Sequence, residues 1–172
     1  TLPNLASASA TNEPGNVLTP RELADRAVAL TAEPGVHAEV LGPEKIEALG
    51  MGLLLGVARG SAEPPRLLCL TYTPPGVTGG PVLGLVGKGI TFDTGGISIK
   101  PAAGMEDMKG DMGGAACVTG LMMALAKRKA KVNAIGAQAQ VRNKPHRKAK
   151  DRHDEGRSLW WQKNEKQKPN AE

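Results

Sequence analysis

Apolar residues recur early in the chain at a spacing that is typical of a helix with one buried face. Leu23, Ala27 and Leu30 fall on the same side of such a helix. The segment 19–22, of sequence TPRE, is typical of a helix start. Its threonine can cap, its proline fits the first turn and its glutamate can return a hydrogen bond to the cap. The pattern therefore predicts a helix over residues 20–33.

Short apolar runs bounded by glycine or proline predict strands. Alternating apolar and polar residues over 36–41 are typical of a half-buried strand, whereas a continuous apolar run indicates a strand buried on both faces. Runs of the second kind cover residues 66–73, 81–86 and 132–139. Between the first two strands, residues 43–49 are predicted to form a short helix.

The stretch from residue 111 to residue 129 predicts a helix that is apolar on nearly all sides and therefore buried. This helix joins the strands 81–86 and 132–139, so the three elements form one βαβ unit, whose two strands must be parallel. The fold class that follows is α/β, with a mixed, largely parallel sheet flanked by helices.

The periodic pattern ends near residue 140 and divides the chain into three parts. Residues 1–18 are a loop leading into the domain, residues 19–140 form a partial α/β domain, and residues 141–172 are a polar tail. The net charge of +5 belongs to the tail, because residues 1–140 hold 12 Lys and Arg against 12 Asp and Glu, whereas residues 141–172 hold 10 against 5. Such a segment buries too little apolar surface to offset the entropy of ordering, so we expect the tail to be disordered.

The basic tail also raises the question of nucleic acid as a partner. Lysines together with Trp160 and Trp161 could stack on single-stranded bases. Charge runs of this kind are usually solvated, so nucleic acid is not the favoured partner.

Composition indicates a cytoplasmic protein with no membrane partner. No segment reaches the ~18 apolar residues of a membrane span, and no secretory signal opens the chain. Cys69 and Cys117 lie in apolar surroundings without metal-type spacing, and we expect buried free thiols in a reducing compartment. The first residue is not Met, which favours a fragment or a processed product.

Charged residues and glycines are concentrated directly after the predicted strand 81–86. Lys88, Asp93, Lys100 and Asp111 follow it within a glycine-rich stretch. Lysine and aspartate are seldom buried unless they are paired or bind a metal, and the carboxyl end of a strand is a common place for a site. Spacing alone leaves three alternatives open: a metal site, a phosphate cradle and a buried ion pair.

The sequence VGKGITFDTGGISIK, followed by KGDMGGAA, resembles the catalytic core of the leucine aminopeptidases, a family of cytosolic two-metal exopeptidases. The resemblance covers residues 11–140 and implies a partial aminopeptidase catalytic domain acting on peptides. It implies that Lys88, Asp93 and Asp111 are metal ligands and that Lys100 is a catalytic lysine. The implied cofactors are two divalent ions, Zn²⁺ or Mn²⁺. Glu106 and Asp107 have no assigned role in the family, and these two residues and Lys109 are predicted to be surface charges.

The family also has a later motif, Asn-Thr-Asp-Ala-Glu-Gly-Arg, for which the nearest match is residues 153–157, HDEGR. The resemblance implies Glu155 as a further metal ligand and Arg157 as the catalytic arginine, which in the family holds a bicarbonate general base. Either His153 or Asp154 stands where the family has its aspartate. Because this segment departs from the family, the second metal site is the less secure of the two.

The function that this resemblance implies is a metal-dependent leucyl aminopeptidase, truncated and weakly active as this chain. The alternative is a non-catalytic derivative that keeps part of the metal site and acts by association. The family is homo-hexameric, and this chain lacks much of the surface that would build a hexamer.

Overall fold

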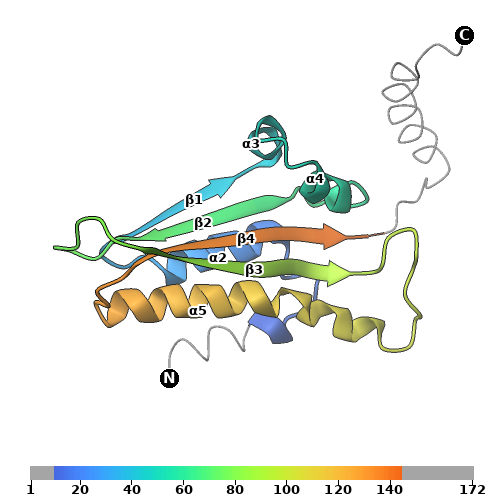
Figure 1. The fold of residues 1–172 in the computed structure, drawn as a ribbon. Helices are drawn as coiled ribbons and strands as arrows, with labels where there is room; N and C mark the ends of the chain where they lie inside the picture. The colour runs from blue at the N-terminus through green and yellow to red at the C-terminus, as the bar shows by residue number, and fades with distance from the viewer. Residues whose placement is uncertain (1–9, 145–172) are drawn as a thin grey trace, which may run out of the picture.

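The computed structural model of the chain describes residues 10–144 as a four-stranded sheet flanked by helices (Figure 1). The tail from residue 145 onwards, including the expectation that it is disordered, lies outside the described residues. In chain order the elements are α2 (Pro20–Leu30), β1 (Val36–Leu41), α3 (Pro43–Ala48), α4 (Gly52–Ala58), β2 (Arg66–Tyr72), β3 (Val82–Asp93), the 3₁₀ helix η1 (Met105–Met112), α5 (Gly113–Lys127) and β4 (Asn133–Asn143).

The sheet has the order β1-β2-β4-β3 and is mixed, which confirms the α/β fold class. The predicted parallel pair is present between β3 and β4. The expectation that parallel pairs dominate is wrong, because β1–β2 and β2–β4 are both antiparallel. Only the connection from β3 through η1 and α5 to β4 is a helical crossover of the kind that keeps two adjacent strands parallel.

One face of the sheet is packed against helices α2 and α5. Its core includes Leu68, Leu70 and Tyr72 of β2 together with Val118 and Met122 of α5, all at least nine-tenths buried. Burial of such side chains is the main term that stabilises the fold. Figure 1 shows α5 running along the sheet beside β3 and β4.

The opposite face of the sheet is covered only in part. Helices α3 and α4 pack over Leu41 and Leu67 at one end. Over β3 and the start of β4 the face is open, so that Val86 is 87% exposed and Ile135 is 42% exposed. Among the described residues β3 is also the last strand of the sheet, so that one of its edges has no partner strand.

Strand β3 is longer than the sequence predicts, and this changes the setting of the charged residues. The apolar run was expected to end at Gly87 and to give way to a loop, but the strand continues to Asp93. Gly87 is needed for close packing and not for a turn, because a Cβ there would lie 2.7 Å from the carbonyl oxygen of Gly114. Strand β4 likewise extends to Asn143, into the range assigned to the tail.

The two cysteines are free thiols, but the prediction that both are buried is wrong. Cys69 on β2 is half-buried and Cys117 on α5 is exposed. Burial, followed by the negative charge of Glu39, raises the pKa of the Cys69 thiol above its ordinary value. Within residues 10–144, no helix has the length and apolar character needed to cross a membrane.

We therefore expect the two thiols to differ in reactivity. The thiolate is the reactive form of a cysteine. At Cys69 the raised pKa lowers the fraction of thiolate, and partial burial limits the access of a reagent to the sulfur atom. Labelling the native chain with 5,5′-dithiobis(2-nitrobenzoate) at pH 8 should show a fast phase from Cys117 and a slower phase from Cys69. The variants Cys117→Ser and Cys69→Ser assign the phases, and equal rates in the two variants would contradict the prediction.

Candidate active site

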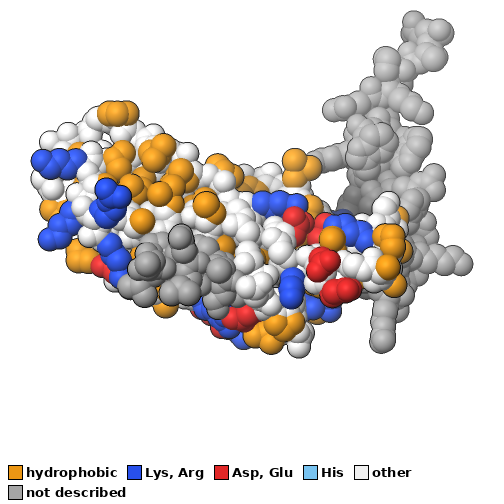
Figure 2. All heavy atoms as spheres, turned by 90° about the horizontal axis from the view of Figure 1, so that it is seen from below, with side chains coloured by type: hydrophobic (Ala, Val, Ile, Leu, Met, Phe, Trp, Pro, Cys, Tyr) orange, Lys and Arg blue, Asp and Glu red, His pale blue; other side chains and the backbone are white. Residues whose placement is uncertain are grey.

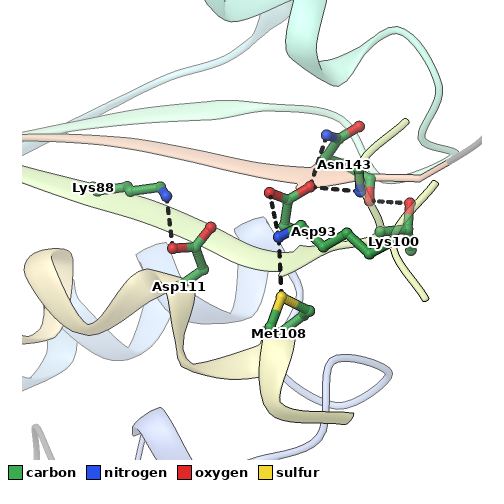
Figure 3. Close-up of polar contacts among 8 residues, drawn as sticks. Lys88, Asp93, Lys100, Met108, Asp111 and Asn143 are labelled. Carbon is green, nitrogen blue, oxygen red and sulfur yellow. Dashed lines mark hydrogen bonds and ion pairs between the residues drawn. The ribbon is translucent and has the colours of Figure 1, made fainter. Parts of the chain in front are cut away.

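The four charged residues singled out in the sequence lie along the second half of β3 and on the segment that follows it. Lys88 and Asp93 belong to β3 itself, Lys100 follows in the loop, and Asp111 comes from η1. Figure 3 shows the side chains of Lys88 and Asp111 turned toward each other beside Asp93 and Lys100. In Figure 2, which views the molecule from below, acidic and basic side chains lie intermingled at the end of the molecule that carries η1 and the end of β3.

Asp93 is the most extensively bonded side chain of the group. Its Oδ1 accepts hydrogen bonds from the backbone N–H of Gly95 and from Nδ2 of Asn143, each at 2.8 Å. Its Oδ2 accepts from Nζ of Lys100 at 3.1 Å. Gly95 has φ +89°, in the left-handed region, and a Cβ there would lie 2.2 Å from the carbonyl oxygen of Ser98. Only glycine therefore allows this turn to aim its N–H at the carboxylate.

The surroundings of Asp93 keep it ionised. Burial is the largest single influence and by itself raises the pKa of the carboxyl group. The hydrogen bond from Gly95, the hydrogen bond and positive charge of Lys100, and the hydrogen bond from Asn143 act in the opposite direction. Together these interactions outweigh burial, so the pKa of Asp93 lies below its ordinary value and the group is a carboxylate at neutral pH.

Lys100 is held between the end of β3 and η1. Its backbone N–H donates to the carbonyl oxygen of Thr94 at 2.9 Å and closes the loop. Its Nζ donates to Asp93 and also to Sδ of Met108 at 3.0 Å. These two contacts fix the ammonium group at the edge of the cluster, and its side chain remains 35% exposed.

Lys88 and Asp111 form the second charged pair. Nζ of Lys88 lies 2.6 Å from Oδ1 of Asp111, and the two side chains are 58% and 27% exposed. The four charges are thus arranged as two ion pairs, Lys88–Asp111 and Lys100–Asp93. These residues, which the resemblance assigns to a metal site, therefore form ion pairs in the structure, but the pairs are partly exposed and not the buried pair that the sequence raised as an alternative.

The donor atoms of this cluster fit a divalent cation in kind but not in number. Carboxylate oxygens suit Zn²⁺ and Mn²⁺, and Asp93 and Asp111 supply them. Across residues 10–144, however, no group of three or more His, Cys, Asp or Glu side chains could hold a metal ion. A complete site needs further ligands, and the predicted ones, Glu155 and with it Arg157, lie outside the described residues.

Two contacts of the candidate site were not predicted from the sequence. Asn143, the last residue of β4, is the register partner of Asp93 and bonds its carboxylate. Its carbonyl oxygen also accepts from the backbone N–H and the hydroxyl of Thr94, at 3.1 and 3.0 Å. Met108 holds Lys100 from the other side. Pairing β3 with β4 in parallel over their full length would have placed Asn143 beside Asp93.

The sequence of the chain is similar to known enzymes along most of its length. The model of the cytosol aminopeptidase family, catalytic domain, matches residues 6–157, so family likeness extends beyond residue 140, where we expected it to end. The probable cytosol aminopeptidase of Brucella anthropi is 61% identical over 134 residues, which are 78% of this chain and 26% of that protein. The probable cytosol aminopeptidase of Alkaliphilus metalliredigens is 55% identical over 138 residues, which are 80% of this chain and 27% of that protein. The chain thus spans about a quarter of the length of these relatives.

Solved structures give the same result. The bottromycin maturation enzyme BotP in complex with Mn is 40% identical, with a TM-score of 0.73, over 85% of this chain and 33% of that one. The cytosol aminopeptidase of Coxiella burnetii is 29% identical, with a TM-score of 0.76, over 83% of this chain and 30% of that one. Both sequence and fold therefore place this chain in the cytosol aminopeptidase family, within its catalytic domain.

Proposed function

We propose that this chain carries the first part of the active site of a metal-dependent aminopeptidase that removes N-terminal residues, such as leucine, from peptides in the cytoplasm. The observation that carries the proposal is the cluster of Lys88, Asp93, Lys100 and Asp111 at the end of β3, in a chain of this family. One solved relative, BotP, holds Mn, which supports a divalent metal here.

In this proposal Lys88, Asp93, Asp111 and Glu155 hold two divalent ions, Zn²⁺ or Mn²⁺. Such ions, when bound, lower the pKa of a water molecule and polarise the peptide carbonyl. Asp93 suits a ligand role because its carboxylate is ionised and its direction is fixed by Gly95 and Asn143. Partners of this kind orient a ligand and tune its affinity for the metal.

Lys88 can act as a ligand only as the neutral amine. In the structure its Nζ forms an ion pair with the carboxylate of Asp111. A nearby divalent charge favours loss of the proton. Release of the Lys88–Asp111 ion pair is therefore the step that this part of the chain must undergo before both side chains can serve as ligands.

Lys100 has a different role in the proposal. It keeps its positive charge and faces the oxygen of the substrate carbonyl on which negative charge develops in the transition state. Its ammonium group has three N–H donors, and Asp93 and Met108 accept from it. The third donor has no partner within residues 10–144 and is available to a substrate. Arg157 completes the proposed catalytic pair.

A chimera tests the proposal, since the chain spans only part of its relatives. Residues 11–143 would replace the aligned segment of the Brucella anthropi enzyme, and hydrolysis of leucine p-nitroanilide would be measured with Mn²⁺. We expect an active chimera, and a loss of about 10²–10³-fold in kcat on Lys100→Ala, as for removal of one donor to an oxyanion. The control Asp107→Ala changes an exposed side chain on η1 and should leave the rate unchanged.

A folded chimera without activity would favour the second candidate, a non-catalytic derivative acting by association. The observation behind that candidate is the open face of the sheet, where Val86 is 87% exposed. Exposed apolar surface of this kind commonly marks an interaction site. If the folded chimera hydrolyses the substrate and Lys100→Ala leaves its kcat unchanged, the role proposed for the lysine is contradicted.

A further inference from the structure

A cavity of about 350 Å³ lies beside the candidate active site, lined by residues 14–16, Phe92, Glu106, Lys109 and Arg142. Phe92 and Arg142 directly precede Asp93 and Asn143 and are register partners across β3 and β4. Successive side chains of a strand point to opposite faces. The cavity therefore lies on the other side of the strand ends from the Asp93–Asn143 pair and is separate from the proposed metal ligands.

Two cations and one carboxylate line this cavity. The guanidinium group of Arg142 lies over the ring of Phe92, 6.0 Å from its centroid. Among the described residues, the Nε atom of Arg142 is buried and finds no hydrogen-bond partner. Within residues 10–144, neither Arg142 nor Lys109 has a side-chain ion pair, although Glu106 lines the same cavity. The lining carries two positive charges against one negative charge.

We propose that this cavity binds a small oxyanion, a phosphate or a carboxylate, through Arg142 and Lys109. The guanidinium group offers planar N–H donors that match the oxygens of such anions, and the ammonium group adds a compact charge. Phe92 covers one face of the guanidinium group and so leaves its edge for the ligand. The volume is sufficient for an ion of this size together with water.

Solvation alone does not account for this arrangement. Glu106 and Lys109 by themselves are consistent with the surface charges that the sequence predicts. A buried donor without a partner is rare in folded proteins, because nearly all such groups find a hydrogen bond. An oxyanion in the cavity would accept hydrogen bonds from the terminal N–H groups of Arg142 and would neutralise the excess positive charge of the lining. The site is independent of the proposed metal chemistry.

The test is a titration of the full chain with inorganic phosphate, in parallel with acetate, by calorimetry at constant ionic strength with EDTA present to exclude divalent metals. We expect saturable binding of one anion, weakened roughly tenfold or more in Arg142→Gln and in Lys109→Gln, because each removes a charge-assisted hydrogen bond. Glu106→Gln should strengthen binding, since it removes the opposing charge. The control Lys127→Gln changes a lysine that is paired with Glu33 and should bind as the unmodified chain does.

The outcomes separate the possible sites. Loss of binding in Lys100→Gln, with Arg142→Gln unchanged, would place the anion at the charged cluster on the other face and overturn the proposal. Absence of saturable binding of both anions, or equal binding by Arg142→Gln and Lys127→Gln, would overturn it as well. Circular dichroism of each variant shows whether it is folded. If either Arg142→Gln or Lys109→Gln does not fold, the other variant still tests the proposal.

Discussion

Replacing Asp93 with alanine is expected to abolish binding of Mn²⁺ or Zn²⁺ by this chain. Asp93 is one of the proposed metal ligands, and the structure holds it ionised and oriented through Gly95, Lys100 and Asn143. In the unmodified chain we expect one tightly bound ion, served by Lys88, Asp93 and Asp111, and a weaker second ion that depends on Glu155. Titration calorimetry measures both, and two equal, tight sites would contradict the argument.

Two variants make this measurement specific. Asp107→Ala removes an exposed carboxylate of η1 and should leave the binding of the first ion unchanged. Asn143→Ala keeps every proposed ligand and removes the amide that orients Asp93. Loss of such a supporting hydrogen bond typically costs about 10–100-fold in metal affinity. Unchanged affinity in Asn143→Ala would show that Gly95 and Lys100 alone suffice to orient the carboxylate.

The isolated chain is expected to hydrolyse leucine p-nitroanilide very weakly or not at all, even with Mn²⁺ or Zn²⁺ added. Catalysis in this proposal needs both ions together with Arg157, and the chain spans about a quarter of the length of its relatives. A misplacement of ~1 Å in an active site can cost on the order of 100-fold in rate. Few apolar residues accompany Glu155 and Arg157 to hold them against the sheet.

The assay would be run beside Lys100→Ala and Arg157→Ala. Residual turnover that neither variant changes would come from a contaminating peptidase or from free metal. Robust turnover that disappears in both variants would show that the segment containing Arg157 completes the site, and the expectation of weak activity would then be wrong.

Local signals in the sequence were sufficient for several elements. The capping threonine was predicted correctly, since the hydroxyl of Thr19 accepts from the backbone N–H of Glu22 at 3.2 Å. The parallel pairing of β3 and β4 followed from the long apolar helix between them. These features depend on residues that are close in sequence or on a helical connection between two strands, and both can be read without the structure.

The extent of β3 and the role of Asn143 depend on contacts between distant residues. The sequence near Gly87 is rich in glycine and looks like a loop, but the glycine is there because α5 approaches the strand closely. Asn143 carries no motif, and its role comes from its position opposite Asp93 in the sheet. The order of residues along the chain does not show which distant residues lie close together in the fold. The charged residues of the site could therefore be predicted, but the Asn143 amide that orients Asp93 could not.

Within the part of the chain that the structure describes, one edge of β3 has no partner strand, and this gives Lys88 a second physical significance. An edge strand exposes backbone groups that can pair with another chain, and natural proteins limit this with charged side chains and bulges. β3 has a register shift between Ile90 and Phe92, and Lys88 is a charged residue two positions from the exposed Val86. The same lysine thus works against intermolecular sheet growth. Replacing Lys88 with an apolar residue would remove this protection against intermolecular pairing. Glutamine is therefore the better substitution for testing the role of Lys88 in the candidate site, because it keeps the strand polar at that position.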